Sequence, residues 1–238
     1  MASAARPAPL HLAGPPHRLL CSEPELSDTR SGALVLPDDL HRYAEGRAIP
    51  VEVRSGRHGA RRMRMRLART TPPGRYAAEL QIEGKNYPVT LDVASAPRLR
   101  IFPSSADFEG RPGGDAEAEI TLVNEGNVTI EVPETAKVGI YDDDGVEFAF
   151  ADTYRQDSDD ANLLVGHWLR KLREGYGGLL KLHMTEGAGP LGPEQRRVVR
   201  ISTRIPSKLR PRHSYHGVWK LGPAFYRVGV TVEQTRAA

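Results

Sequence analysis

One group of potential metal ligands stands out in the sequence, the acidic run Asp142-Asp143-Asp144 that is followed by Gly145 and Glu147. Clustered carboxylates on a turn supply the hard oxygen ligands that calcium prefers. The further spaced ligands of an EF-hand loop are missing here, and Asp-Gly is also a common composition of a β-hairpin turn. We therefore interpret the run as a turn and predict no metal and no cofactor.

A second chemically active group is the basic run at residues 61–69, in which arginines alternate with apolar residues. Strict alternation predicts a strand with one buried and one basic face. The arginines of the basic face are Arg62, Arg64 and Arg66. Such a face can bind an acidic partner through fork-like hydrogen bonds, or it can be a solvated surface that discourages edge-to-edge aggregation.

Aromatic and histidine residues gather near the carboxyl end of the chain. His213, Tyr215 and His216 lie close in sequence to Trp219 and Tyr226. These side chains can pack in a β-hairpin core, or form an aromatic platform for a sugar. The sequence contains no nucleophile elbow, no phosphate-binding loop and no paired-histidine zinc motif, so we predict that the protein is not an enzyme.

Composition narrows the class of partner. The chain has 238 residues, with 33 basic and 30 acidic ones, and this near balance argues against nucleic-acid binding by bulk charge. Its single cysteine, Cys21, excludes an intramolecular disulfide. No apolar stretch has the length of a membrane span or of a signal peptide, so the sequence predicts no membrane insertion and either a cytoplasmic protein or one whose export signal lies outside this sequence.

The elements that must position these groups are mostly strands. The clearest pattern is at residues 118–132, where apolar and polar residues alternate on both sides of Asn-Glu-Gly-Asn at positions 124–127. We expect the two halves to pair as an antiparallel hairpin. The same pattern predicts strands at residues 75–81 and 89–93, and a strand at residues 146–150 that returns from the acidic turn.

One segment, residues 158–174, has the pattern of a helix. Leu164, Trp168 and Leu172 recur at helical spacing, Ser158 or Asp159 can cap the start, and Gly175 can end it. We expect this amphipathic helix to interrupt a β-sandwich. Its apolar stripe either covers the end of its own domain or meets another chain, with Trp168 as anchor.

The order of these patterns predicts a domain organisation. Residues 1–17, rich in Ala, Pro and Gly, are expected to be a flexible leader. A first β-sandwich then spans 18–94, and a second spans 97–234, with the helical insertion near 158–174. The two halves end in similar hairpins, which suggests two sandwiches in tandem.

Short motifs carry a family resemblance. Leu-Arg-Ile-Phe-Pro at 99–103, the turn at 124–128 and the hairpin motifs at 72–76 and 88–91 resemble immunoglobulin-like repeats of prokaryotic surface proteins. Arg-Val-Val-Arg-Ile at 197–201 is similar, more weakly, to a strand of periplasmic pilus chaperones. The resemblance implies an all-β protein of two tandem immunoglobulin-like sandwiches and an extracytoplasmic location.

The function that we expect is a non-catalytic structural or protein-binding module that acts as a scaffold. Its partner is then another protein chain or a second copy. The alternatives are a carbohydrate-binding or carbohydrate-active accessory protein, with a glycan as ligand, and a chaperone-like carrier of surface-fibre subunits. The partner-binding candidates are Leu164, Trp168, Leu172, Arg62, Arg64 and Arg66.

Overall fold

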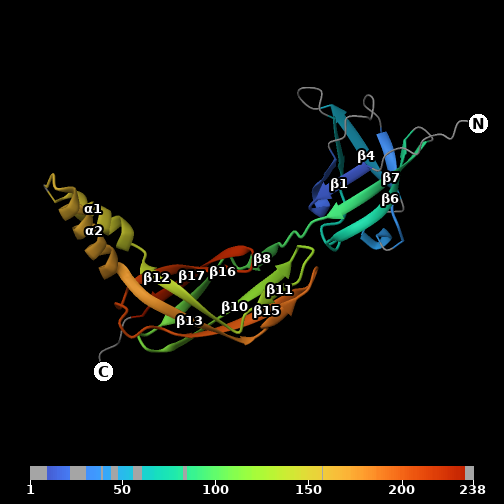
Figure 1. Cartoon of the computed structure of the whole chain (residues 1–238). Helices are drawn as coiled ribbons and strands as arrows, with labels where there is room; N and C mark the ends of the chain where they lie inside the picture. Colours follow the sequence, from blue (N-terminus) through green and yellow to red (C-terminus); the bar gives the residue numbers. More distant parts are fainter. Residues whose placement is uncertain are drawn as a thin grey trace, which may run out of the picture. The chain divides into compact units, whose positions relative to one another are not determined.

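The computed structural model describes residues 10–21, 31–38, 40–43, 48–55, 61–82, 85–156 and 158–233. By its internal contacts the chain divides into two compact units. The first comprises Met1–Arg98, Glu125–Thr129 and Gly192–Glu194; the second comprises Leu99–Asn124, Ile130–Leu191 and Gln195–Ala238. Both are built mainly from β-strands, which confirms the predicted all-β class (Figure 1). The sandwich boundaries at 18–94 and 97–234 stay a prediction.

The described residues of the first unit form seven strands and two short 3-10 helices. The strands are β1 (Leu10–Gly14), β2 (Leu19–Cys21), β3 (Ser31–Val35), β4 (Ala48–Ser55), β5 (Arg61–Met65), β6 (Gly74–Ile82) and β7 (Lys85–Val93). The 3-10 helices are η1 (Pro16–Arg18) and η2 (His41–Tyr43). The strands follow the order β1-β2-β5-β4-β3-β6-β7, and β1 pairs in parallel with β7, so the hydrogen-bonded ladder closes on itself.

Strand β1 lies inside the segment that we expected to be a flexible leader. Leu10 and Leu12 alternate with exposed residues and are buried in the core of the first unit. The sequence analysis missed this strand because its parallel partner, β7, is about 80 residues away in the chain.

The predicted basic face is present on β5 and the residues that follow it. Met65 and Leu67 are buried, whereas Arg64 and Arg66 are exposed, as strict alternation requires. The side chain of Arg62 lies outside the described residues, and its backbone pairs with Arg54 of β4.

The second unit contains a large sheet and a small one. Its strands are β8 (Leu99–Phe102), β9 (Ser105–Gly110), β10 (Asp115–Asn124), β11 (Ile130–Val132), β12 (Thr135–Asp142), β13 (Tyr176–Glu186), β14 (Gly189–Leu191), β15 (Arg196–Arg204), β16 (Ser214–Leu221) and β17 (Ala224–Val232). Eight of them follow the order β8-β10-β15-β13-β12-β16-β17-β9.

Both units have the same strand order. If β8 and β9 are counted as two parts of one first strand, and β11 and β14 of the small sheet are left out, each unit runs first, second, fifth, fourth, third, sixth and seventh strand. Each unit ends in an antiparallel hairpin, β6–β7 or β16–β17, whose last strand pairs in parallel with the first strand of that unit. The predicted closing hairpins are therefore present.

The strand pairing predicted across the turn at 124–127 is wrong. The apolar residues Ile120, Leu122, Ile130 and Val132 are buried as expected, but β11 pairs with β14 and not with β10. The reason lies in Asn127, whose side chain accepts a hydrogen bond from the Ala96 amide (2.7 Å) and donates to the Thr71 and Ala94 carbonyls. These bonds hold the turn away from the geometry of a tight hairpin.

Candidate functional site

A helical hairpin joins the third and fourth strands of the second unit. It consists of α1 (Gly145–Tyr154) and α2 (Ala161–Gly175), which lie side by side between the ends of β12 and β13 (Figure 1). Helix α2 is the helix predicted at 158–174. Its cap is Asp160, whose Oδ1 accepts a hydrogen bond from the Asn162 amide at 2.9 Å, and not Ser158 or Asp159 as expected.

Helix α1 replaces the strand that we predicted at residues 146–150. The acidic run before it does not form a hairpin turn. Asp142 instead accepts a hydrogen bond from His213 at 2.8 Å, and Asp143 pairs with His216. The following residues then wind into a helix that packs on α2, so tertiary context overrides a short apolar run that fits either structure.

Two glycines close the base of the hairpin. A Cβ on Gly175, the last residue of α2, would lie 3.2 Å from the Cα of Gly145, the first residue of α1. Real side chains seldom allow so close a contact, so glycine at both ends lets the two backbones touch. This contact sets the spacing at which the two helices leave the sheet.

Small residues of α1 form the seam between the helices. Ala149 is fully buried and Thr153 is 9% exposed, and the Thr153 hydroxyl donates to the Ala149 carbonyl at 2.7 Å. The three predicted residues of α2, Leu164, Trp168 and Leu172, are half-buried. No residue of α2 within the described chain is buried, because small seam residues cover little of their partner.

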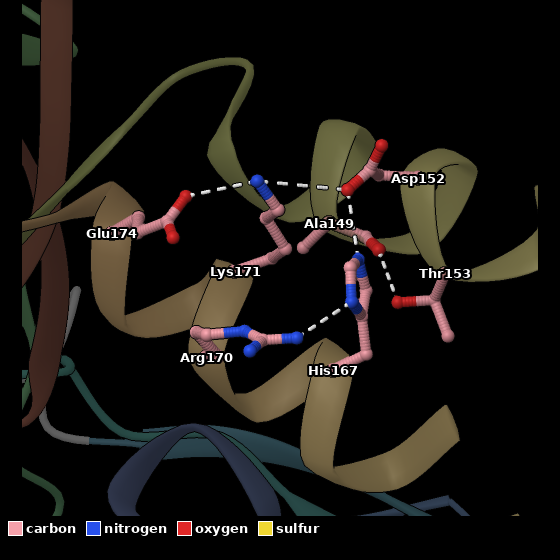
Figure 2. Close-up of polar contacts among 7 residues, drawn as sticks. All are labelled: Ala149, Asp152, Thr153, His167, Arg170, Lys171 and Glu174. Carbon is pink, nitrogen blue, oxygen red and sulfur yellow. Dashed lines mark hydrogen bonds and ion pairs between the residues drawn. The ribbon is translucent and has the colours of Figure 1, made fainter. Parts of the chain in front are cut away.

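One side of the hairpin carries a network of charged side chains (Figure 2). His167 donates through Nε2 to Asp152 at 2.8 Å, and Lys171 reaches the same carboxylate at 3.6 Å. Lys171 also pairs with Glu174 at 3.1 Å, while Arg170 donates to Nδ1 of His167 at 2.9 Å. Within the described residues, the hydrogen bonds and ion pairs of this network join α1 to α2 through Asp152.

The network determines the tautomer of His167 and lowers the pKa of Asp152. Nδ1 of His167 accepts from Arg170, so the ring proton is on Nε2, which donates to Asp152. That hydrogen bond lowers the pKa of the Asp152 carboxyl below its ordinary value, and the charge of Lys171 adds to the effect.

The other side of the hairpin is apolar and open to solvent. Val146, Phe150 and Tyr154 follow one another at intervals of four residues along α1, and Val165 and Leu169 do so along α2. These five residues, which we call the apolar face, are 43%, 44%, 85%, 52% and 55% exposed, respectively. Each helix thus contributes one stripe of large side chains to the apolar face.

Trp168 borders the apolar face. Its ring stacks at a tilt on Phe150, with 5.2 Å between the ring centroids. Its Nε1 is buried and has no hydrogen-bond partner among the described residues. A buried N–H without a partner is unusual, and this one belongs to a ring that contacts Phe150 of the apolar face.

The other predicted residues lie elsewhere. Arg64 and Arg66 belong to the first unit and the hairpin to the second. Trp219 and Tyr226 are 4% and 3% exposed, and they pack in the core of the second unit. Within the described ranges, no three His, Cys, Asp or Glu side chains are grouped so that they could hold a metal ion.

The sequence analysis missed most of the apolar face. Phe150 was assigned to a strand and Leu169 was not singled out, because Leu164, Trp168 and Leu172 give the stronger helical repeat. That repeat marks the side of α2 nearest to α1. Phe150 and Tyr154 at helical spacing were the signal for α1, which the preceding Asp-Gly turn pattern outweighed.

Comparisons with known proteins give no family. No family model and no curated protein matches the sequence. Among solved structures, an ASH / PapD-like domain of human CEP192 is 13% identical, with 58% of this chain and 87% of that chain covered and a TM-score of 0.31. A protein of unknown function from Porphyromonas gingivalis is 12% identical, with 95% and 96% covered and a TM-score of 0.30.

A third similar structure, domains 4 and 5 of the S-layer protein SbsC, is 12% identical, with 68% of this chain and 66% of that chain covered and a TM-score of 0.29. Likenesses at this level carry no argument about function. In the part of the chain that is described, neither helix has the length and apolar content that crossing a membrane requires.

Proposed function

We propose that this protein is a non-catalytic protein-binding module, in which the β units are the scaffold and the helical hairpin docks on another protein chain. The observation that carries the proposal is the apolar face, five large side chains that are at least 43% exposed on two adjacent helices. Exposed apolar residues scattered singly are ordinary, whereas a contiguous group marks a site of interaction.

The arrangement of charges supports a docking role. By their spacing along the two helices, the ion pairs at Asp152, Lys171 and Glu174 lie on a different side of the hairpin from the apolar face. The apolar face therefore has aromatic and aliphatic centres with polar surroundings, which is the usual anatomy of a protein interface. Phe150 and Trp168 are the expected anchors, since large aromatic side chains dominate binding energies.

A scaffold role for the strands is supported by the first unit. It has the same strand order as the second unit, and the described residues between its third and fourth strands form no helical hairpin. The hairpin is thus not needed to complete the sheet, and an addition to a rigid scaffold is a common place for function.

Other candidate roles have less support. Burial of Trp219 and Tyr226 removes the aromatic platform on which the carbohydrate-binding alternative rested. No observation favours a carrier of fibre subunits. The basic face with Arg62, Arg64 and Arg66 stays a prediction of a second partner contact, and Arg64→Glu is the variant that tests it.

Site-specific photocrosslinking tests the proposal directly. The probe is p-benzoylphenylalanine, placed at Leu169 in the full chain within its native cells. The matched control places it at Leu163, which is 65% exposed on the same helix but lies one turn from His167, beside the charged network. We expect discrete protein adducts from position 169 and few from 163. Equal or absent adducts at position 169 would contradict the proposal.

A further inference from the structure

We propose that the apolar face binds the same face of a second copy of this chain, with the two α2 helices antiparallel about a two-fold axis. This inference rests on the proposed function, because it names the partner of the docking surface. A two-fold contact requires a self-complementary surface, in which each half supplies what the other half lacks. Helix α2 has that property in its charges as well as in its apolar residues.

The charges of α2 are separated along its length. Asp159 and Asp160 are at its amino end, and Arg170, Lys171 and Arg173 are near its carboxyl end, where the acidic Glu174 is already paired with Lys171. Antiparallel packing of two α2 helices places the acidic end of each beside the basic end of the other. Parallel packing would instead place like charges together, which disfavours it.

Two of these charges are free to make such a contact. Asp159 and Arg173 are exposed, and neither has an ion-pair partner in the described part of the chain. Asp160 caps α2, and Lys171 already pairs with Asp152 and Glu174. Arg173 also follows Leu169 by four residues, so it borders the apolar face. In the dimer, Asp159 of each copy would pair with Arg173 of the other copy, which gives one such pair on each side of the axis.

The apolar part of the contact is tested with matched leucine variants of the full chain. Sedimentation equilibrium should show a monomer–dimer equilibrium for the unmodified protein. We expect Leu169→Glu to weaken dimerisation at least about a hundredfold, because the two-fold axis places two such residues in the contact. Leu163→Glu, on the side of the charged network, should change it less than about threefold. Equal effects would overturn the proposal.

Charge exchange tests the antiparallel arrangement. Asp159→Arg and Arg173→Glu should each weaken the homodimer by about tenfold, because each variant faces like charges twice. An equimolar mixture of the two variants should regain the original affinity, since the mixed dimer pairs opposite charges at both sites. A mixture that associates no better than either variant alone would overturn the antiparallel arrangement.

The two proposals fail in different ways. If the chain sediments as a monomer while the probe at position 169 captures a different protein, the second-copy proposal is overturned and the docking function stands. If position 169 yields no adduct above position 163, both are overturned. Adducts between two copies of this chain, together with rescue by the mixed variants, would support both.

Discussion

The two β units differ in the connection between their third and fourth strands: its leucines are buried in the first unit, whereas large apolar residues are exposed in the second. In each unit the third strand must connect to the fourth, from β3 to β4 or from β12 to β13. In the described part of the first connection, Leu36 and Leu40 are buried in the core, 3% and 0% exposed. In the second connection, Phe150 and Leu169 remain 44% and 55% exposed on the hairpin.

The difference shows how the structure of a connection decides whether its apolar residues are buried. In the first connection, Leu36 and Leu40 reach the core and contribute to folding. A helical hairpin leaves the sheet and must make its own seam. Because that seam uses Ala149 and Thr153, it covers few of the large side chains, and these become available to another molecule.

Truncation of the two tryptophans of the chain should lower the free energy of unfolding by different amounts. Trp219→Ala, in the core of the second unit, should lower the free energy of unfolding by about 3–5 kcal/mol. Trp168→Ala removes a half-buried side chain that contacts Phe150, so we expect a loss of about 1–2 kcal/mol, confined to the hairpin. Urea denaturation followed by helical and sheet circular dichroism measures both. Equal losses would mean that the hairpin belongs to the core.

Leucines of the two connections provide a sharper comparison. Leu40→Ala should lower the free energy of unfolding of the first unit by about 2–5 kcal/mol, because it leaves a cavity in a closed core. Leu169→Ala should change the stability of the second unit by less than about 0.5 kcal/mol, as an exposed substitution does. Thermal unfolding of both variants checks this. A large loss from Leu169→Ala in a monomeric sample would contradict the exposed face.

Acid should weaken the hairpin through Asp152, the smallest effect that we predict. The folded-state pKa of this carboxyl is lowered, so its contribution to stability is complete above the ordinary pKa of 3.8 and is lost as the pH falls through the lowered value. The helical circular dichroism signal, titrated from neutral to acid pH, should therefore fall less steeply in Asp152→Asn than in the unmodified chain. Identical titrations would mean that Asp152 stabilises nothing.

The strands of the closing hairpins and helix α2 could be predicted from the sequence, whereas the site could not be predicted completely. Alternation at Ala78, Leu80, Val89 and Leu91 is a local pattern with one structural solution, and burial confirms it. The helical repeat of Leu164, Trp168 and Leu172 identified α2 for the same reason. Which side of α2 stays exposed depends on where α1 packs. Helix α1 is itself formed by a run of residues that fits a strand equally well.

Long-range contacts account for the remaining differences. Strand β1 forms because it pairs with β7. Strand β11 does not pair with β10, because the Asn127 side chain forms hydrogen bonds with the backbone of Ala94 and Ala96. Neither partner is close enough in sequence to leave a local signal. Arg64 and Arg66 were placed on an outer face correctly, because alternation alone determines that.

Removal of the hairpin tests the central claim most directly. Residues 145–175 are replaced by a short Gly-Ser link, which keeps Asp142 and Asp143 and their contacts with His213 and His216. If the hairpin is a docking element on a complete scaffold, the shortened chain will unfold cooperatively with nearly unchanged stability and will no longer dimerise in sedimentation equilibrium. A shortened chain that cannot fold, or that still dimerises with the original affinity, would contradict the account.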